Sequence, residues 1–233
     1  ISPFFMFLFI GTCGVFYPVT CYDAFEKQII ANQYVRLIHS TGCIYSLLPI
    51  LYHNPPTIID VNHTPIPEEV IRVFDRTISF FLWDCIALLL SNEKEKTLFI
   101  SHHLLSVANI GISRYFGFNW YLMCIALFLG EITNPLTQVS DFYEITNVQN
   151  IAFEKVYFYS MLISRGFLIP LIIISYLHNI HYHYVMVRTM IYLYQLNLLF
   201  NLVSMNLITI GSVTWLHKKY LVLYKNNNDK KMS

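Results

Sequence analysis

The chain has 233 residues, of which 55% are hydrophobic and 12% are charged, and its formal net charge is +1. This composition excludes an ordinary soluble domain and is typical of an integral membrane protein. The near-neutral charge, without a clustered basic face, also excludes a surface for nucleic acid. We therefore predict one all-α membrane domain.

Seven apolar runs are long enough to cross a bilayer as helices. In chain order they span residues 3–20, 37–52, 77–91, 98–113, 119–138, 156–177 and 193–216. The first run lacks the basic start of a secretory signal and the chain lacks an initiator methionine, so we expect a membrane helix in a fragment without its native N-terminus. The predicted fold class is a polytopic transmembrane helical bundle of about seven helices.

Basic residues in the connecting segments predict the orientation of the chain. These residues are Lys27, Arg36, Lys94, Lys96, Lys155, Lys218, Lys219, Lys225, Lys230 and Lys231. The segment from His53 to Asp75 is acidic and carries a glycosylation sequon at Asn62, as a lumenal segment would. We expect a lumenal N-terminus and a cytosolic C-terminus, with Arg114 and Arg188 as exceptions to the charge rule.

The chain ends in Lys230-Lys231-Met232-Ser233, which resembles the dilysine retrieval signal of membrane proteins of the endoplasmic reticulum. Such a signal is an address that a coat protein reads at a cytosolic end. The alternative is a solvated polar tail. We favour the signal, which predicts residence in the endoplasmic reticulum and recognition by a coat protein.

Ionisable residues inside the apolar runs are the main functional lead. Each charged group at the centre of a membrane helix costs roughly 3 kcal/mol, so these groups must face one another or a wet cavity. Pro135 removes the helical hydrogen bond to the carbonyl of Glu131, and Pro170 removes the bond to Gly166, beside Arg165. We expect both charges beside loosened backbone that is buried in protein or lines a cavity. The alternative is two ordinary kinks with a Glu131–Arg165 ion pair.

Two adjacent histidines, His102 and His103, lie about one turn inside the fourth run. Neighbouring residues of a helix diverge by about 100°, so the two rings must have different surroundings. An imidazole can act as a general base or as a nucleophile near neutral pH, and Asp84 and Glu131 are candidates to orient it. His39 is a second-tier candidate, because it lies near the expected start of a helix, where a histidine can snorkel to the interface.

Cysteine and histidine patterns give no support for a metal or a resident cofactor. The cysteines have no CxxC spacing and indicate small buried side chains. They are Cys13, Cys21, Cys43, Cys85 and Cys124. The tract His178–His183 suggests an iron-dependent desaturase, but it is lumenal in this topology and has no partner boxes, so we favour an interfacial loop. A transporter is disfavoured because the halves show no inverted repeat.

Six short motifs, taken in order, resemble the TLC-domain family, which groups ceramide synthases with translocon-associated and lipid-homeostasis membrane proteins. The motifs are Val35–Ser40, Thr77–Asp84, His102-His103, Leu129–Leu136, Ser164–Pro170 and Asn201–Asn206. The resemblance implies six helices in a barrel-like bundle around a lipid-accessible cavity, preceded by one extra helix, in endomembranes. It divides the chain into an N-terminal helix and loop (1–34), a TLC domain (35–219) and a polar cytosolic tail (220–233).

The resemblance also implies a chemistry. In ceramide synthases the paired histidines are required to transfer an acyl chain from acyl-CoA to the amine of a sphingoid base, which points here to His102 and His103. Those enzymes carry two aspartates on the next helix, whereas this chain has Glu131-Ile132-Thr133-Asn134-Pro135. That pattern is more similar to the TLC-domain-containing subfamily than to true ceramide synthases.

Two classes of function stay open. The first is an acyltransferase that uses fatty acyl-CoA as co-substrate and a membrane lipid as acceptor. Its catalytic candidates are His102, His103, Asp84 and Glu131, and its substrate-binding candidates are Asn134, Arg165, His39 and Asn206. The second is a non-catalytic lipid-binding or lipid-homeostasis protein, or a cargo adaptor, in which the same groups bind a head group or hold the bundle together. A homodimer is compatible with both.

Overall fold

The computed structural model describes residues 24–53, 65–91, 96–117, 120–145 and 150–171, together with the separate residues 203, 210, 211, 213, 214, 217, 218 and 221. All regular structure within this part is helical, in agreement with the predicted class. The expectations for residues 3–20, Cys13, Cys21, Asn62, His178–His183, Asn206 and Lys230-Lys231 lie outside the described residues. The elements are α2 (Ala24–His53), α3 (Glu68–Leu90), α4 (Lys96–Phe116), α5 (Trp120–Glu131), α6 (Asn134–Ile145), α7 (Ile151–Met161) and the π-helix η1 (Leu162–Leu168).

Helix α2 is longer than the apolar run from which it was predicted. It begins at Ala24 rather than near residue 37, so Arg36 lies within the helix and not in a connecting loop. The prediction of a loop at Arg36 was wrong because it took each charged residue as the end of a span. Arg36 is tolerated inside the helix because Asp84 of α3 neutralises its charge, as described below.

Helix α3 also begins earlier than predicted, and part of the expected lumenal segment belongs to it. Pro67 precedes the helix, and Glu68 and Glu69 occupy its first turn, where carboxylates interact well with the helix dipole. Most of its buried positions follow helical spacing and make one continuous face: Val70, Val73, Phe74, Thr77, Phe80, Phe81, Asp84, Ala87 and Leu88. Trp83 and Cys85 add buried side chains at the edges of this face. This face packs against α2 and α4.

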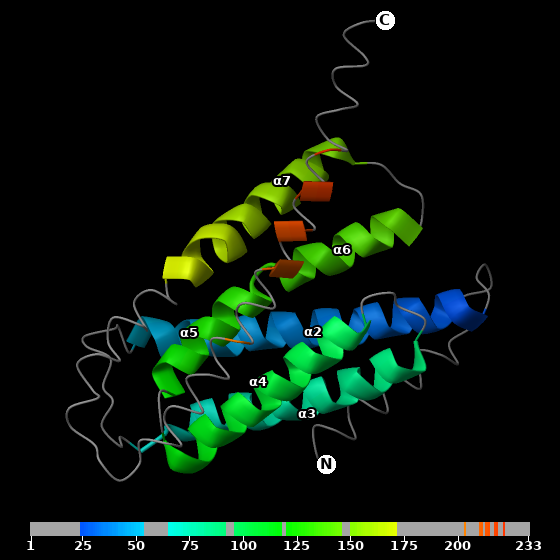
Figure 1. The fold of residues 1–233 in the computed structure, drawn as a ribbon. Helices are drawn as coiled ribbons and strands as arrows, with labels where there is room; N and C mark the ends of the chain where they lie inside the picture. Colours follow the sequence, from blue (N-terminus) through cyan, green and yellow to red (C-terminus); the bar gives the residue numbers. More distant parts are fainter. Residues whose placement is uncertain are drawn as a thin grey trace, which may run out of the picture.

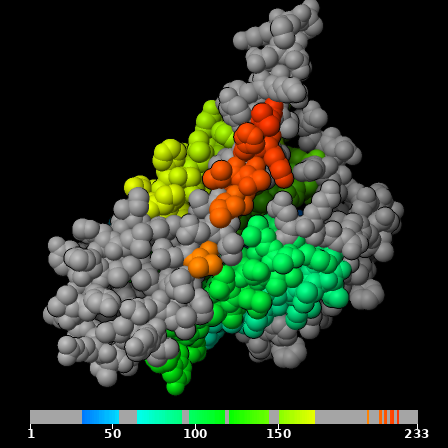
Figure 2. All heavy atoms as spheres, in the orientation of Figure 1, coloured from blue at the N-terminus to red at the C-terminus, as the bar shows by residue number. Residues whose placement is uncertain are grey.

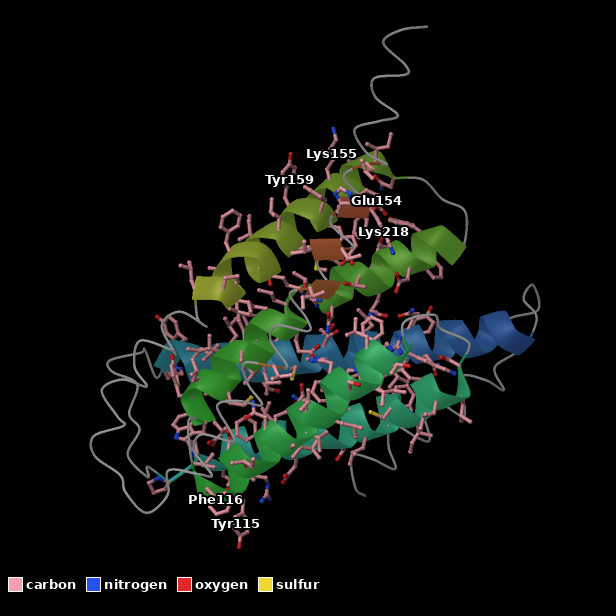
Figure 3. The ribbon with its side chains drawn as sticks, in the orientation of Figure 1. Tyr115, Phe116, Glu154, Lys155, Tyr159 and Lys218 are labelled. Carbon is pink, nitrogen blue, oxygen red and sulfur yellow. The ribbon has the colours of Figure 1, made fainter. Side chains whose placement is uncertain are left out.

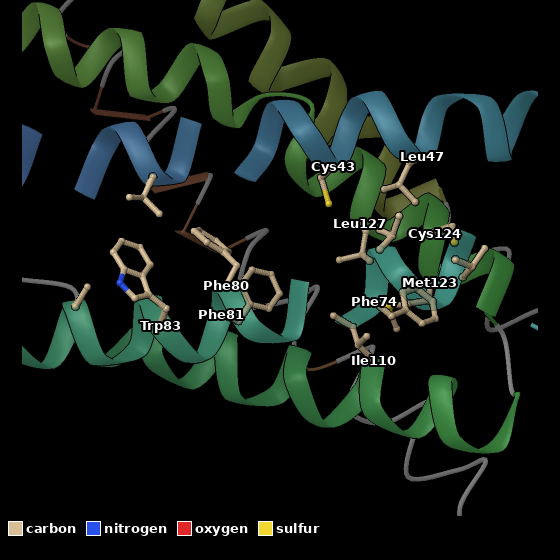
Figure 4. Packing of buried hydrophobic residues seen from close by; sticks show 14 residues of the cluster. Cys43, Leu47, Phe74, Phe80, Phe81, Trp83, Ile110, Met123, Cys124 and Leu127 are labelled. Atoms are coloured by element: carbon tan, nitrogen blue, oxygen red, sulfur yellow. The ribbon is translucent and has the colours of Figure 1, made fainter. Parts of the chain in front are cut away.

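The hydrophobic core lies where α2, α3, α4 and α5 meet (Figure 4). Buried side chains come from all four helices, and the largest share comes from α3. They include Cys43 and Leu47 of α2, Phe74, Phe80, Phe81 and Trp83 of α3, Ile110 of α4, and Met123, Cys124 and Leu127 of α5. The core fixes the four helices relative to one another, and the polar groups described below are held between the same helices.

The run predicted at 119–138 forms two helices rather than one. Helix α5 ends at Glu131, a two-residue turn follows, and α6 begins at Asn134. Pro135 stands in the first turn of α6, where a missing N–H is tolerated. The expected loosening of the backbone beside Glu131 is confirmed.

Helix α7 continues directly into η1. Asn150 caps its start, because its side chain accepts a hydrogen bond from the N–H of Phe153 at 3.1 Å. At the other end, the N–H of Ile169 donates to the carbonyl of Ser164, five residues earlier, and Pro170 follows. Single π-turns of this kind occur mostly inside helices at functional sites. Pro170 therefore accompanies a widened turn around Arg165.

The helices are arranged around α2 (Figure 1). Helices α3 and α4 pack along each other on one side of α2, and α5 and α6 also contact α2, while α7 and η1 pack on α5 and α6. In Figure 2 the described residues between 203 and 221 lie between α4 and α7. One of them, Gly211, lies against Leu98 of α4.

Within the described residues, one helical stretch is both long and apolar enough to cross a membrane unaided, namely Trp120–Tyr143. The predicted bundle of about seven spanning helices is therefore not confirmed. Charged residues explain part of the difference, since α3 alone contains Glu68, Glu69, Arg72, Asp75, Arg76 and Asp84.

Candidate functional site

Asp84 is at the centre of a contact among three helices. Its Oδ1 accepts a 2.9 Å hydrogen bond from Nε of Arg36 on α2, and its Oδ2 lies 2.9 Å from Nε2 of His103 on α4. The Asp84 side chain is 4% exposed and that of Arg36 is 17% exposed. We call these three residues the His103 cluster. In it a buried carboxylate is neutralised by a cation while it also orients an imidazole, as predicted for Asp84.

The two adjacent histidines have different surroundings, as the helical geometry predicted. His103 is buried, and its ring stacks on Phe81 with ring centroids 4.6 Å apart. His102 is half-buried and meets Phe81 edge-on at 6.2 Å. The structure therefore brings His103, and not His102, into contact with Asp84. The stacked Phe81 and the carboxylate together hold the His103 ring in one orientation.

His39 lies in the interior and not at a membrane interface. It is mid-way along α2 and buried, and its ring stacks on Phe80 at a centroid distance of 3.7 Å. Its Nε2 is 3.8 Å from Oε1 of Glu131. The interpretation of His39 as a helix-end residue failed because α2 begins at Ala24, fifteen residues before it.

A second set of polar contacts surrounds the break between α5 and α6. Nδ2 of Asn134 donates to Oε2 of Glu131 at 2.8 Å, and Oδ1 of the same amide accepts from Nη2 of Arg165 at 2.7 Å. Arg165 also donates to the carbonyl of Gly130 at 3.1 Å, and Ser164 donates to the carbonyl of Leu129 at 2.9 Å. We call Glu131, Asn134, Ser164 and Arg165 the Arg165 cluster.

Asn134 lies between Glu131 and Arg165, for which a direct ion pair was the alternative interpretation of the sequence. Its NH₂ group donates to the carboxylate of Glu131, and its carbonyl oxygen accepts from the guanidinium of Arg165. The donor of the amide therefore faces the anion and the acceptor faces the cation. The break leaves the carbonyls of Leu129 and Gly130 outside the regular helical hydrogen bonds. They accept hydrogen bonds from the side chains of Ser164 and Arg165 of η1 instead. The loosened backbone beside Pro135 is thus buried in protein and hydrogen-bonded.

Arg36 is the functional-site residue that sequence reasoning missed. It had been assigned to a cytosolic loop on its charge alone. The available signal was its spacing, because Arg36, Ser40, Cys43 and Leu47 recur at intervals of three and four residues, as one face of a helix does. A cation on that face predicts an anionic partner on a neighbouring helix.

The described cysteines fit the expected role of small buried side chains. Cys43, Cys85 and Cys124 are buried free thiols. Cys43 lies in the core, with its Sγ 3.5 Å from Oγ1 of Thr77.

Comparison with known families gives an independent result. A family model described as TLC domain matches residues 29–214. The chain belongs to the TLC-domain family. Proteins of this family are membrane proteins linked to lipid metabolism, and the resemblance seen in the six motifs is confirmed. A search of curated proteins finds no significant match.

Proposed function

We propose that this TLC-domain protein transfers a fatty-acyl group from acyl-CoA to an amine or hydroxyl of a membrane lipid, with His103 as general base. The observation that carries the proposal is the 2.9 Å contact between Nε2 of His103 and Oδ2 of Asp84. An ionised Asp84 accepts the Nε2–H and fixes the neutral ring with its lone pair on Nδ1. Nδ1 is buried and has no hydrogen-bond partner in the described part of the chain, so the proposal requires the acceptor to enter beside it and bring its proton to this atom.

The transfer step then balances without any further reagent. Nδ1 of His103 removes a proton from the acceptor amine or hydroxyl as the acceptor attacks the thioester carbon. A C–N or C–O bond forms, the C–S bond breaks, and the thiolate of coenzyme A takes the proton back from the imidazolium. In the covalent variant, Nδ1 attacks the thioester first, the C–S bond breaks and an acyl-imidazole forms with release of the thiolate of coenzyme A. The acceptor then attacks the acyl carbon, the N–C bond breaks, and the thiolate takes up the proton that the acceptor loses.

The other candidates receive supporting roles in this proposal. Glu131 and Asn134 hold the head group of the acceptor, with Arg165 and His39 beside them and Asn206 as a further contact. The acyl chain enters an apolar cavity, where each buried CH₂ contributes about 0.8 kcal/mol. Fatty acyl-CoA is the co-substrate, and no resident cofactor or metal is required.

We also propose a cellular location, a membrane topology and partners for the chain. The chain crosses the membrane of the endoplasmic reticulum about seven times, six helices form the barrel-like bundle of residues 35–219, and the C-terminus is cytosolic. There a coat protein reads Lys230-Lys231, and two copies associate as a homodimer. The TLC-domain match supports a membrane location, and the Arg36–Asp84 contact between α2 and α3 supports the packing of the bundle.

The test is acyl transfer from labelled acyl-CoA in microsomes that contain the wild-type chain, His103→Ala or His102→Ala at matched expression. We expect His103→Ala to reduce product about 100-fold or more, because general-base catalysis contributes at least that factor. His102→Ala should have a smaller effect, since His102 does not contact Asp84. Wild-type protein that forms no product with sphingoid or glycerolipid acceptors would contradict the proposal.

A second function, non-catalytic lipid binding in lipid homeostasis or cargo adaptation, is favoured by one observation. Arg36 shares the carboxylate of Asp84 with His103, so part of the negative charge that would strengthen the base is already neutralised. In that case the His103 cluster mainly joins α2, α3 and α4. His103→Ala would then lower thermal stability and leave lipid products unchanged.

A further inference from the structure

Helix α2 has an exposed stripe with the spacing of a seam between two helices. Six of its exposed positions recur at alternating intervals of four and three residues, as the contact positions of a coiled coil do. They are Tyr34, Ile38, Thr41, Tyr45, Leu48 and Tyr52. We call these six uncharged residues the α2 stripe. Helices α3, α5 and α6 pack on other faces of α2, so the stripe is the face that the described helices leave open.

The two ends of the α2 stripe are separated by about the thickness of a membrane. Tyr34 and Tyr52 are 18 residues apart, or about 27 Å along a helix, which is close to the thickness of the hydrocarbon core of a bilayer. Tyrosine is enriched at both boundaries of that core, where its hydroxyl reaches water. Tyr45 lies about 10 Å along the helix from the nearer end. In the membrane bundle proposed above, its hydroxyl is therefore at hydrocarbon depth.

Two hydroxyl groups of the α2 stripe need a partner at this depth. The side chain of Tyr45 is 81% exposed, and neither its hydroxyl nor that of Thr41 has a hydrogen-bond partner among the described residues. By contrast, the hydroxyls of Ser40 and Ser46 on the same helix donate to carbonyls four residues earlier. Lipid chains accept and donate no hydrogen bonds, whereas a neighbouring helix can do both. The stripe therefore suits a protein partner better than it suits lipid.

A second copy of the chain has the matching groups at the matching depth. Two copies in one membrane have the same orientation, so their α2 helices run parallel and equal positions meet around a two-fold axis. Side chains of a helix lean toward its N-terminus, which brings the hydroxyl of Tyr45 about one turn along, to the level of Thr41 on the second copy. The symmetry forms this pair twice. Apolar residues of the stripe then meet apolar residues.

We propose that two copies of this chain associate through the α2 stripe, with Tyr45 of each copy hydrogen-bonded to Thr41 of the other. The inference rests on the membrane arrangement of the proposed function and identifies the surface of its homodimer, but it does not depend on acyl transfer. Arg36 lies outside the stripe and faces Asp84 of α3. The association therefore leaves the His103 cluster intact.

The first test places the photoreactive amino acid p-benzoylphenylalanine at position 45 of the full chain in microsomes, with mass spectrometry of the adducts. An adduct that joins the α2 helices of two copies would support the proposal. Adducts only with lipid, or only within one chain, would overturn it, because they would identify another occupant of the stripe. Tyr115 is the matched control, since it is 80% exposed, points away from the bundle (Figure 3) and lies outside the stripe. The same replacement there should join copies far less often.

Two copies with different affinity tags separate this inference from the homodimer itself. Copies that purify together but give no adduct between copies at position 45 would overturn the α2 stripe as the interface and leave the homodimer standing. Copies that do not purify together would overturn both. Acyl transfer is measured separately, so its absence would contradict the proposed reaction and not the interface.

The second test measures association by energy transfer between labelled copies in liposomes, at increasing ratios of lipid to protein. Tyr45→Phe removes only the hydroxyl and should weaken association about sevenfold, as expected for two interhelical hydrogen bonds in a membrane. Thr41→Val should have the same effect, and the double variant should lose no more than either one, because both remove the same bond. Tyr52→Phe is the matched control at the level of water and should change association less than about twofold. Equal losses in Tyr45→Phe and Tyr52→Phe, or additive losses in the double variant, would overturn the proposal.

Discussion

The His103 cluster and the Arg165 cluster are both buried and polar, but they use charge differently. In the His103 cluster, side chains from three helices contact one another, and the carboxylate of Asp84 joins Arg36 to His103. In the Arg165 cluster, Ser164 and Arg165 donate to backbone carbonyls next to the α5–α6 break. The first arrangement leaves a ring nitrogen available for chemistry. The second provides hydrogen-bond donors to backbone carbonyls that lie outside the regular helical hydrogen bonds at Pro135 and the turn.

This difference separates the proposed base, which acts in the chemical step, from a cluster that stabilises the α5–α6 break and is proposed to lie beside the head group of the acceptor. A buried carbonyl without a donor costs about 1 to 3 kcal/mol, so the Arg165 cluster has a sufficient structural reason to exist. In the part of the chain that the structure describes, Arg36 and His103 each bond to Asp84, and the backbone groups of the break bond to other residues. Substitutions in the two clusters should therefore affect stability and activity in different proportions.

The largest effect is expected for Asp84→Asn. It removes the negative charge between Arg36 and His103 and leaves a mostly buried guanidinium without its carboxylate, at a cost of about 3 kcal/mol in unfolding free energy. Lipid product should also be lost. Denaturation in detergent measures the first effect and the microsomal assay the second. Asp75→Asn is the matched control, because it removes an exposed Asp–Arg pair of the same helix and should cost less than about 1 kcal/mol.

Arg165→Met should come next, with a loss of about 2 kcal/mol. The substitution leaves Oδ1 of Asn134 and the carbonyl of Gly130 without the donor that Arg165 provides, and it removes the cation nearest to them. Activity per folded molecule should fall far less than in Asp84→Asn. A full loss of product in well-folded Arg165→Met would show that Arg165 acts in the chemical step and not only beside the head group of the acceptor.

Ser164→Ala should lower the unfolding free energy by about 1 kcal/mol, the value of one buried hydrogen bond to the carbonyl of Leu129. Hydrogen exchange of the α5–α6 segment would detect where the loss occurs. Protection should decrease near the break and stay unchanged in α3. A decrease in α3 alone would contradict the assignment of Ser164 to the break.

The smallest effect is expected for Arg72→Ala. Arg72 is 62% exposed and pairs with Glu68 on the same helix, so its loss should change the unfolding free energy by less than about 0.5 kcal/mol. Activity should be unchanged. A loss above 1 kcal/mol would mean that the surface of α3 is covered by another part of the protein.

The sequence predicted the helical class, the family, and the contact of Asp84 with one of the two adjacent histidines. These three predictions succeeded because each depends on a feature that a single sequence contains: the hydrophobic runs, the order of the motifs, and a buried carboxylate that needs a compensating partner. Pro135 likewise predicted loosened backbone beside Glu131, since the loss of its N–H acts locally, but not that the run 119–138 would divide into two helices.

The sequence did not predict the start of α2 or the role of Arg36. A charged residue ends a membrane helix only when it has no partner, and the partner of Arg36 is 48 residues away in α3. The same long-range pairing hid the choice between His102 and His103. The π-turn at η1 was not predicted either, because Pro170 shows that a bond is lost but not how the neighbouring turn readjusts.

The charges of α3 have a consequence for how the protein is made. Asp75, Arg76 and Asp84 contact α4, α2, and both α2 and α4, respectively. A helix with these charges is poorly retained in lipid before its neighbours arrive, whereas residues 120–143 are apolar enough to enter alone. In the proposed membrane bundle, α3 would therefore enter the bilayer together with α2 and α4, and a fault in any one of the three should divert the newly made chain to degradation.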